Sequence, residues 1–435
     1  MRFDYNLILV LLIWLLFYIS YKYFYAKAKT FPINDVGFIW IFTLILYGTI
    51  PYMSWYLQGQ KFSILNQRLF FLDPEVENIR YILYLVLACM IGFMVIHSFL
   101  SNYFAYFNLK ESKKKTPQPI LFLSILIFVS IIIFESIFSG LINLESASTR
   151  SESYAIMNAL PTGFRQVFRF ISIFKNFTTI VLTVYIFQTW PRFKSILIFY
   201  IIYLVYFTFI SGGRANLLLF LFSTLICYHV IVEKIKTRNI ILFGFGGLTG
   251  FVLFGIFRQN NILDMSQLGG FGEFSNIWAN AFKVQKSNEL MPFSVRFNDF
   301  FSYVPSQFLW FNKESPSIWF LKTFYPGYIE AGHGLGFGIF AEIMSGYGIL
   351  EAFIRGGLIA FFMFLIMKAI ARDNYWWSFP LNIFLVLNIF QSIRDTSFRF
   401  ITDIFQQMVI PTIIIICLQH VIFSIKYKNY IAESD

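Results

Sequence analysis

The feature that most constrains this chain is a series of continuously apolar runs, each about 20 residues long, that recur along its 435 residues. A helix of that length crosses the hydrocarbon core of a bilayer. Strands of a membrane barrel would instead alternate apolar and polar residues over about 10 positions, and these runs do not alternate. Only 13% of the residues are charged, against roughly 25% in a typical soluble domain. The sequence therefore predicts an all-α, polytopic membrane protein.

The apolar runs predict about eleven transmembrane helices, within a range of about 10 to 12. We expect these helices near residues 5–21, 36–57, 79–100, 119–138, 170–189, 195–211, 215–232, 240–257, 347–368, 376–392 and 402–423. The first run ends in aromatic residues and Lys22 without a small-residue cleavage site. We therefore interpret it as a retained helix rather than as a signal peptide that is removed.

An alternate set of connectors between these helices is rich in lysine and arginine. Its charges are Lys22, Lys27 and Lys29; Lys110 and the lysines at 113–115; Arg192 and Lys194; Lys234, Lys236 and Arg238; Lys368 and Arg372; and Lys426 and Lys428. Because positively charged loops remain in the cytoplasm, we expect an external N-terminus and a cytoplasmic C-terminus. This distribution also accounts for the formal net charge of +11 without a nucleic-acid partner.

The longest connector, residues 258–335, contains no spanning run and is predicted to be external. Loops of that length are usually functional. It is rich in aromatic residues, which stack on sugar rings or lie at the level of the lipid headgroups. A further short helix is expected in the membrane interface at 336–346. The chain thus divides into helices one to eight (1–257), a long external loop (258–346), and helices nine to eleven with a cytoplasmic tail (347–435).

The stretch "SGGR" places Arg214 at the predicted external end of the seventh helix. Gly212 and Gly213 permit a tight turn there. The positive pole of the helix dipole disfavours a cation at that position, so a bound anion would explain the arginine. Free backbone N–H groups and a guanidinium together suit phosphate or pyrophosphate. The alternative is an arginine that extends to the lipid headgroups without a specific ligand.

Other arginines on the predicted external side extend this cationic site. Arg258 follows the eighth helix, Arg296 lies in the long loop, and Arg394 and Arg399 belong to "RDTSFRF" in the last hairpin. Each alone is typical of a solvated or headgroup-contacting charge. Together they predict an outward-facing cationic basin that binds pyrophosphate or glycan.

Two residues of the glycine-rich stretch that begins at Glu330 are candidates for a general base. His333 is the histidine that the predicted topology places outside, and imidazole accepts a proton near neutral pH. Glu342 competes for this role, since burial would raise the pKa of its carboxyl. Glu342 is equally suited to hydrogen-bond a sugar or to pair with an arginine. His333 is equally interpreted as a loop residue without a catalytic role.

Arg355 lies inside a predicted membrane helix, where a charge is either functional or paired. It is a further candidate for binding the substrate. Glu351 is four residues earlier and therefore on the same helix face, so a structural ion pair is the alternative.

The carboxylates of "DPEVE", Asp73, Glu75 and Glu77, resemble an acidic metal motif of metal-dependent lipid-phosphosugar transferases. An aspartate followed by proline is also a usual helix start, and we prefer that interpretation. The three cysteines all lie in apolar runs and have no zinc-ligand spacing. We predict no metal site and no cofactor.

The layout of spans, the external "SGGR", and the "GxGxGxxAEIMSGYG" pattern from Gly334 to Gly348 resemble bacterial oligosaccharide repeat unit polymerases. These are the Wzy-type O-antigen and capsule polymerases, which are relatives of O-antigen ligase. The resemblance covers most of the chain in layout. This sequence has Gly213 where many members have serine.

The resemblance implies a multi-pass glycosyltransferase of the GT-C type in the bacterial cytoplasmic membrane. Its substrate would be oligosaccharide carried on undecaprenyl pyrophosphate, and the growing glycan would move onto a new unit outside the cell. Arg214 and the other arginines would stabilise the leaving pyrophosphate, and His333 or Glu342 would accept the hydroxyl proton. Membrane lipid, a chain-length regulator and a flippase are the implied partners.

Three alternatives remain open from the sequence. The first is a flippase or transporter of lipid-linked oligosaccharide, which would need polar residues along a path through the membrane. The second is a metal-dependent transferase that uses a lipid monophosphate sugar. The third is O-antigen ligase, which attaches finished polymer to a lipid core.

Overall fold

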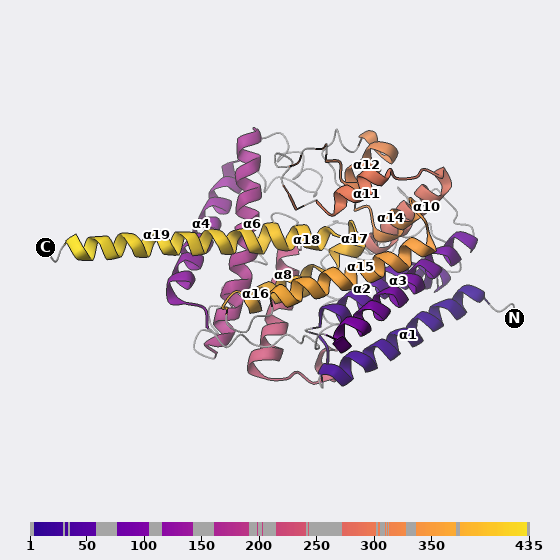
Figure 1. Cartoon of the computed structure of the whole chain (residues 1–435), viewed down its shortest axis with the longest axis horizontal. Helices are drawn as coiled ribbons and strands as arrows, with labels where there is room; N and C mark the ends of the chain where they lie inside the picture. The colour runs from indigo at the N-terminus through magenta and orange to yellow at the C-terminus, as the bar shows by residue number, and fades with distance from the viewer. Residues whose placement is uncertain are drawn as a thin grey trace.

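The computed structural model of this chain consists of helices and their connections in the part that it describes. The described residues are 4–28, 31–33, 35–57, 76–103, 115–141, 161–190, 198, 202, 215–240, 242, 272–301, 303–304, 309, 311, 313–327, 336–370 and 375–432. No β-strand occurs among them. The predicted all-α class is thus confirmed for these residues (Figure 1).

The helices follow the predicted order. Those before the long connector are α1 (Tyr5–Ala28), α2 (Val36–Leu57), α3 (Val76–Tyr103), α4 (Gln118–Leu141), α6 (Thr162–Gln188) and α8 (Ala215–Cys227), which continues as a π-helical turn, η3 (Tyr228–Val232). The predicted external loop 258–346 contributes α10 (Gly272–Ser287), α11 (Phe293–Asp299), α12 (Pro316–Phe324) and α14 (Ile339–Met344). The rest are α15 (Ile349–Ile370), α16 (Ser378–Asn388), α17 (Gln391–Arg394), α18 (Arg399–Ile404), the π-helical turn η6 (Phe405–Val409) and α19 (Ile410–Ala432).

Within the described residues, five helical segments are long and apolar enough to cross a membrane. They are Tyr5–Ala28, Val36–Met53, Asn78–Asn102, Ile349–Ala369 and Arg399–Val421. Shorter apolar helices cover Gln118–Phe134, Ile173–Gln188 and Leu219–Val232. The predicted helices at 195–211 and 240–257 lie outside the described residues apart from single positions. These helices are consistent with the predicted α-helical membrane protein, and the count of about eleven spans stays a prediction.

The helices α1, α2 and α3 alternate in direction. The Tyr52 hydroxyl near the end of α2 donates to Asp4, just before α1, at 2.8 Å, so α1 and α2 are antiparallel. Tyr5 and Tyr84 are in hydrogen-bond contact near the starts of α1 and α3. Tyr23 contacts Ser101 near the ends of the same helices, which are therefore parallel. These directions fit a chain that crosses the membrane in successive passes.

The helices α3 and α15 pack with their backbones in direct contact. A Cβ added at Gly92 would collide with the carbonyl oxygen of Phe353, and one added at Gly356 would collide with that of Cys89. Small residues permit such an approach, which is a usual way for membrane helices to associate. This contact fixes the start of α15, from which two of the site's charged side chains extend.

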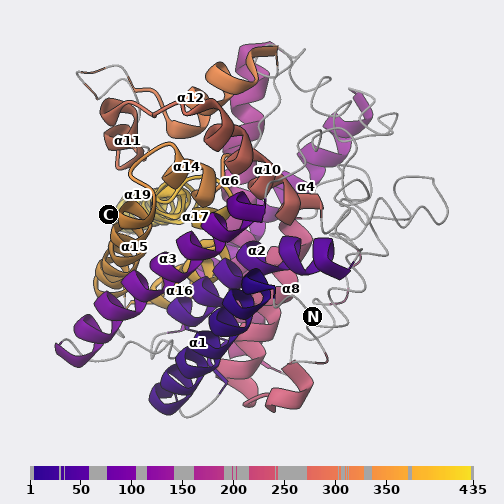
Figure 2. The ribbon, with the colours of Figure 1, turned by 90° about the vertical axis from the view of Figure 1, so that its right-hand side faces the viewer.

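The described helices of residues 258–346 gather at one end of the bundle. Figures 1 and 2 show α10, α11, α12 and α14 gathered at that end. Helix α10 is anchored to α2, because the indole of Trp278 donates to the carbonyl oxygen of Tyr47 at 2.9 Å. The short helix expected at 336–346 in the membrane interface is α14, and its side chains from Ile339 to Ile343 are buried inside the protein.

Candidate functional site

The glycine-rich segment that leads into α14 lies directly on the backbone of the last hairpin. The N–H of Gly338 donates to the carbonyl oxygen of Asp395 at 2.8 Å. A Cβ at Gly336 would lie 2.6 Å from the carbonyl oxygen of Arg394. Gly338 has a φ of 86°, which favours glycine. The glycines therefore serve close packing between two segments that are about 60 residues apart in the sequence.

Glu342 of α14 has no exposed surface. One carboxylate oxygen, Oε1, lies 2.6 Å from Nη1 of Arg355. The other, Oε2, accepts hydrogen bonds from the N–H of Ser397 at 2.9 Å and from its hydroxyl at 2.7 Å. Of the roles that the sequence leaves open for Glu342, the structure shows the pairing with an arginine.

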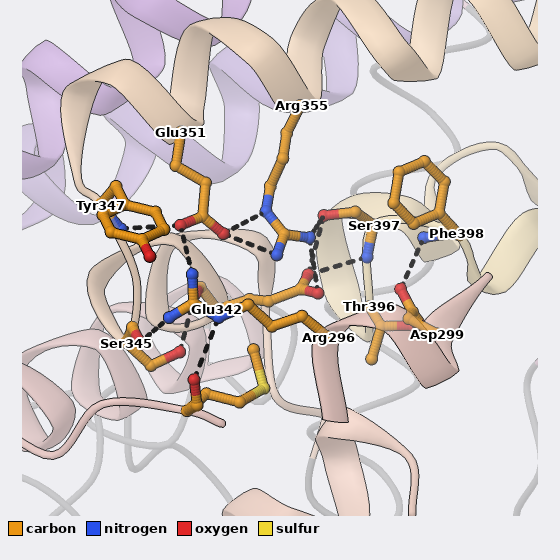
Figure 3. Close-up of polar contacts among 11 residues, drawn as sticks. Arg296, Asp299, Glu342, Ser345, Tyr347, Glu351, Arg355, Thr396, Ser397 and Phe398 are labelled. Atoms are coloured by element: carbon orange, nitrogen blue, oxygen red, sulfur yellow. Dashed lines mark hydrogen bonds and ion pairs between the residues drawn. The ribbon is translucent and has the colours of Figure 1, made fainter. Parts of the chain in front are cut away.

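Arg355 joins two carboxylates. Its Nε donates to Glu351 Oε1 at 2.7 Å, and its Nη2 lies 2.6 Å from the same oxygen. Its Nη1 donates hydrogen bonds to Glu342 Oε1 and, at 3.0 Å, to the hydroxyl oxygen of Ser397 (Figure 3). The ion pair with Glu351 that the helical spacing suggests is therefore present, and a second carboxylate from α14 completes it.

Arg296 of α11 completes the group from the opposite side of Glu351. Its Nη1 lies 2.9 Å from Glu351 Oε2. Its Nε donates to the carbonyl oxygen of Met291 at 3.1 Å, and its Nη2 donates to that of Ser345. The guanidinium lies 5.3 Å from the ring centroid of Tyr347, within the range of a cation–π contact.

We call Arg296, Glu342, Glu351 and Arg355 the interior cluster. It brings together three predicted site residues, Arg296, Glu342 and Arg355, with the predicted ion-pair partner Glu351. Two guanidinium groups face two carboxylates, so the charges of the interior cluster are balanced. A balanced and buried group of this kind holds segments together, and it offers no excess positive charge to an anionic ligand.

Asp299 is a buried acid next to this cluster, and it is not among the site residues predicted from the sequence. Its carboxylate accepts hydrogen bonds from the hydroxyl of Thr396 at 2.9 Å and from the N–H of Phe398 at 3.3 Å. Burial raises the pKa of Asp299 to about 8, and the charge of Glu342 adds to this rise. The only sequence signal is an acid in an aromatic stretch, "RFNDFF", which alone does not distinguish it from a loop acid.

The hairpin edge, which we define as Arg394, Asp395 and Arg399, differs from the interior cluster in its exposure. The side chain of Arg399 is 43% exposed. Its Nε lies 3.2 Å from Asp403 Oδ1 and 3.8 Å from Asp395 Oδ2. Arg394 is half-buried and belongs to the short helix α17. Asp395 accepts a hydrogen bond from the hydroxyl of Ser317 in α12 at 2.5 Å.

Several predicted site residues lie outside the described part of the chain. These are Arg214, Gly212, Gly213, Arg258 and His333. Their proposed contact with the other arginines stays a prediction. Within the described residues, no group of three or more His, Cys, Asp or Glu side chains could hold a metal ion.

No family model matches this chain, and no curated protein or solved structure matches it at a significant level. The likeness to oligosaccharide repeat unit polymerases therefore rests on the layout of the spans and on the two motifs.

Proposed function

We propose that this chain is an integral membrane glycosyltransferase that polymerises oligosaccharide units carried on undecaprenyl pyrophosphate, on the external face of the bacterial cytoplasmic membrane. One observation carries the proposal. The glycine-rich acidic segment and the arginine-containing last hairpin, which are far apart in the sequence, are joined at one end of the bundle through Gly338, Glu342 and Ser397. The positive-inside pattern assigns this end to the exterior.

The proposal divides the predicted arginines into two roles. Arg296 and Arg355 have carboxylate partners and hold the site's framework. Arg399 keeps a large exposed surface at the edge of the same site, where a diphosphate could approach it. Arg214, at the start of the seventh helix, is the further anion contact that the proposal requires. Arginine suits this task because its planar fork binds phosphate oxygens in pairs.

In the proposed reaction, a sugar hydroxyl of the new unit attacks the anomeric carbon of the growing glycan. The new glycosidic C–O bond forms as the C–O bond to the carrier pyrophosphate breaks, and the electron pair of the broken bond goes to the departing pyrophosphate. The hydroxyl proton moves to a general base. Both oxygens of Glu342 are already bonded and the side chain is buried, so we assign the base role to His333 rather than to Glu342.

The direct test is to delete the chain's gene in its host and to measure the length of surface glycan on gels. The proposal expects single repeat units on the cell surface, and it expects long polymer to return when the wild-type chain is supplied. Complementation with Arg214→Lys should leave polymer short, since a point charge does not reproduce a bidentate fork.

The same experiment separates the alternatives. Loss of all surface glycan, single units included, would assign a flippase and would contradict the proposal. Accumulation of long polymer on the carrier lipid, with none attached to its final acceptor, would assign a ligase. Normal polymer after the deletion would exclude any role in this process.

A further inference from the structure

The turn Thr396–Phe398 is held by two carboxylates that come from different helices. Asp299 of α11 receives hydrogen bonds from the side chain of Thr396 and the backbone of Phe398. Glu342 of α14 accepts hydrogen bonds from both the backbone N–H and the hydroxyl of Ser397 (Figure 3). Three consecutive residues are thus clasped from two sides. We call this arrangement the carboxylate clasp.

The clasp lies between the two arginines of the hairpin edge. Arg394 and Asp395 precede the clasped turn directly, and Arg399 follows it. The side chain of Arg399 starts one residue after Phe398, whose N–H is bound by Asp299. A change in the turn must therefore move both arginines.

The charges around the clasp are not balanced once Asp299 is counted. The interior cluster has two carboxylates and two guanidinium groups, and Asp299 adds a third carboxyl. The charged groups that act on Asp299 are Glu342 of α14, Arg355 of α15 and Arg399 of α18. Arg355 already forms ion pairs with Glu342 and Glu351, and Arg399 forms ion pairs with Asp395 and Asp403. Neither arginine is therefore left to neutralise Asp299. An uncompensated buried carboxylate is costly, and such a group usually keeps its proton instead.

We propose that Asp299 is a positioning residue that holds a proton, and that the clasp keeps the Thr396–Phe398 turn closed while Asp299 is neutral and loosens the turn when that proton is lost. The proposal about the turn rests on these hydrogen bonds, burial and charges and needs no assumed function. The further proposal that the turn positions Arg394 and Arg399 against a pyrophosphate rests on the proposed function.

The direction of the pH effect follows from the position of the proton. The pKa of Asp299 is raised from 3.8 to about 8 in the folded chain. The folded state therefore holds the proton more tightly than the unfolded state does. The stability from this group is fully present below about pH 4 and falls as the pH rises toward about 8. Between these two pKa values the ratio of open to closed turn should rise about tenfold per pH unit, and above about pH 8 it should level off.

Hydrogen–deuterium exchange of the full-length protein in lipid nanodiscs tests the clasp directly. In the wild type, amides of residues 396–398 should exchange faster at pH 9 than at pH 6, by up to about a hundredfold after correction for the intrinsic chemistry of exchange. Asp299→Asn mimics the neutral acid, so its turn should stay protected at both pH values. Asp299→Ala should expose the turn at both. Thr396→Val, which removes one hydrogen bond and keeps the side-chain shape, should show partial exposure and is expected to fold if Asp299→Ala does not.

Two results would overturn the clasp. One is a wild-type pH response that persists unchanged in Asp299→Asn, because the proton would then reside elsewhere. The other is a fully protected turn in both Asp299→Ala and Thr396→Val. Polymer length in cells tests the consequence for the arginines separately. An open turn in Thr396→Val together with polymer of normal length would overturn the positioning role while leaving the clasp in place.

Discussion

The interior cluster and the hairpin edge both contain arginines, and they differ in how those arginines are neutralised. In the interior cluster, Arg355 is buried and shared between two carboxylates at 2.6 Å. At the hairpin edge, Arg399 is 43% exposed, and its Nε lies 3.2 Å and 3.8 Å from its two carboxylate partners. From the sequence, Arg399 is predicted to belong to a cationic basin, and Arg355 is a further candidate for binding the substrate. The structure divides them into arginines that hold helices together and arginines with surface left for a ligand.

The difference shows that the role of an arginine can be inferred only when its carboxylate partners are known. Burial makes a missing partner expensive, whereas water and salt replace a partner at the surface. Substitutions in the interior cluster should therefore reduce stability first and function as a consequence. Substitution of Arg399 should reduce stability less than substitution of Arg355, because Arg399 is partly exposed although its partner Asp403 is buried.

The largest effect is expected from Arg355→Ala. The substitution leaves Glu342 and Glu351 buried without their shared cation, and breaking a buried pair in this way costs about 3–5 kcal/mol. Chemical denaturation in detergent micelles measures the loss. In the double variant Arg355→Met with Glu342→Gln, the remaining pair of Arg296 and Glu351 is balanced, so much of the stability should return. If the double variant is as unstable as Arg355→Ala, charge balance is not what holds the cluster.

The second-largest loss of stability is expected from Arg296→Lys. An ammonium group can keep the ion pair with Glu351, but it cannot also reach the carbonyl oxygens of Met291 and Ser345. Leaving such acceptors without donors costs about 1–3 kcal/mol. The same denaturation measurement checks this value, with Lys286→Ala on the exposed face of α10 as the control. A loss no larger than that of the control would mean that a single charge at Arg296 is sufficient.

Much of the fold was accessible from the sequence, because apolar runs of bilayer length are a strong signal. The predicted range 36–57 coincides with α2, and the predicted start of the ninth helix lies two residues before α15 begins. The ion pair of Glu351 with Arg355 also followed from helical spacing.

The rest of the site depends on contacts between distant segments. Nothing local in the sequence places Asp299 against residues 396 and 398, or Ser397 against Glu342. The folding of the long connector into packed helices was likewise not evident, since its helices are short and α10 has no membrane-length apolar run. Burial of Glu342 and its ion pair with Arg355 were inaccessible for the same reason.

Arg399→Ala tests the hairpin edge, as Arg355→Ala and Arg296→Lys test the interior cluster. Arg399 is partly exposed but its partner Asp403 is buried, so its loss should lower the free energy of unfolding by about 1–2 kcal/mol, less than the loss of Arg355 does. Under the proposed function the same substitution should shorten surface polymer strongly, since a cation next to the leaving pyrophosphate is lost. Denaturation and glycan gels on the same variant give both values. A variant that is stable and still makes long polymer would remove Arg399 from the proposed site.

The smallest effect is expected from Lys322→Ala, which tests whether burial or distance decides the value of an ion pair. Lys322 Nζ lies 2.7 Å from Glu314 Oε1, closer than Arg296 Nη1 is to Glu351 Oε2 at 2.9 Å. The lysine side chain is 61% exposed, however, so water replaces its partner and the loss should stay below about 1 kcal/mol. Polymer length should not change. A loss equal to that of Arg296→Lys would mean that short distance alone sets these energies, and the division between interior cluster and hairpin edge would then have no energetic basis.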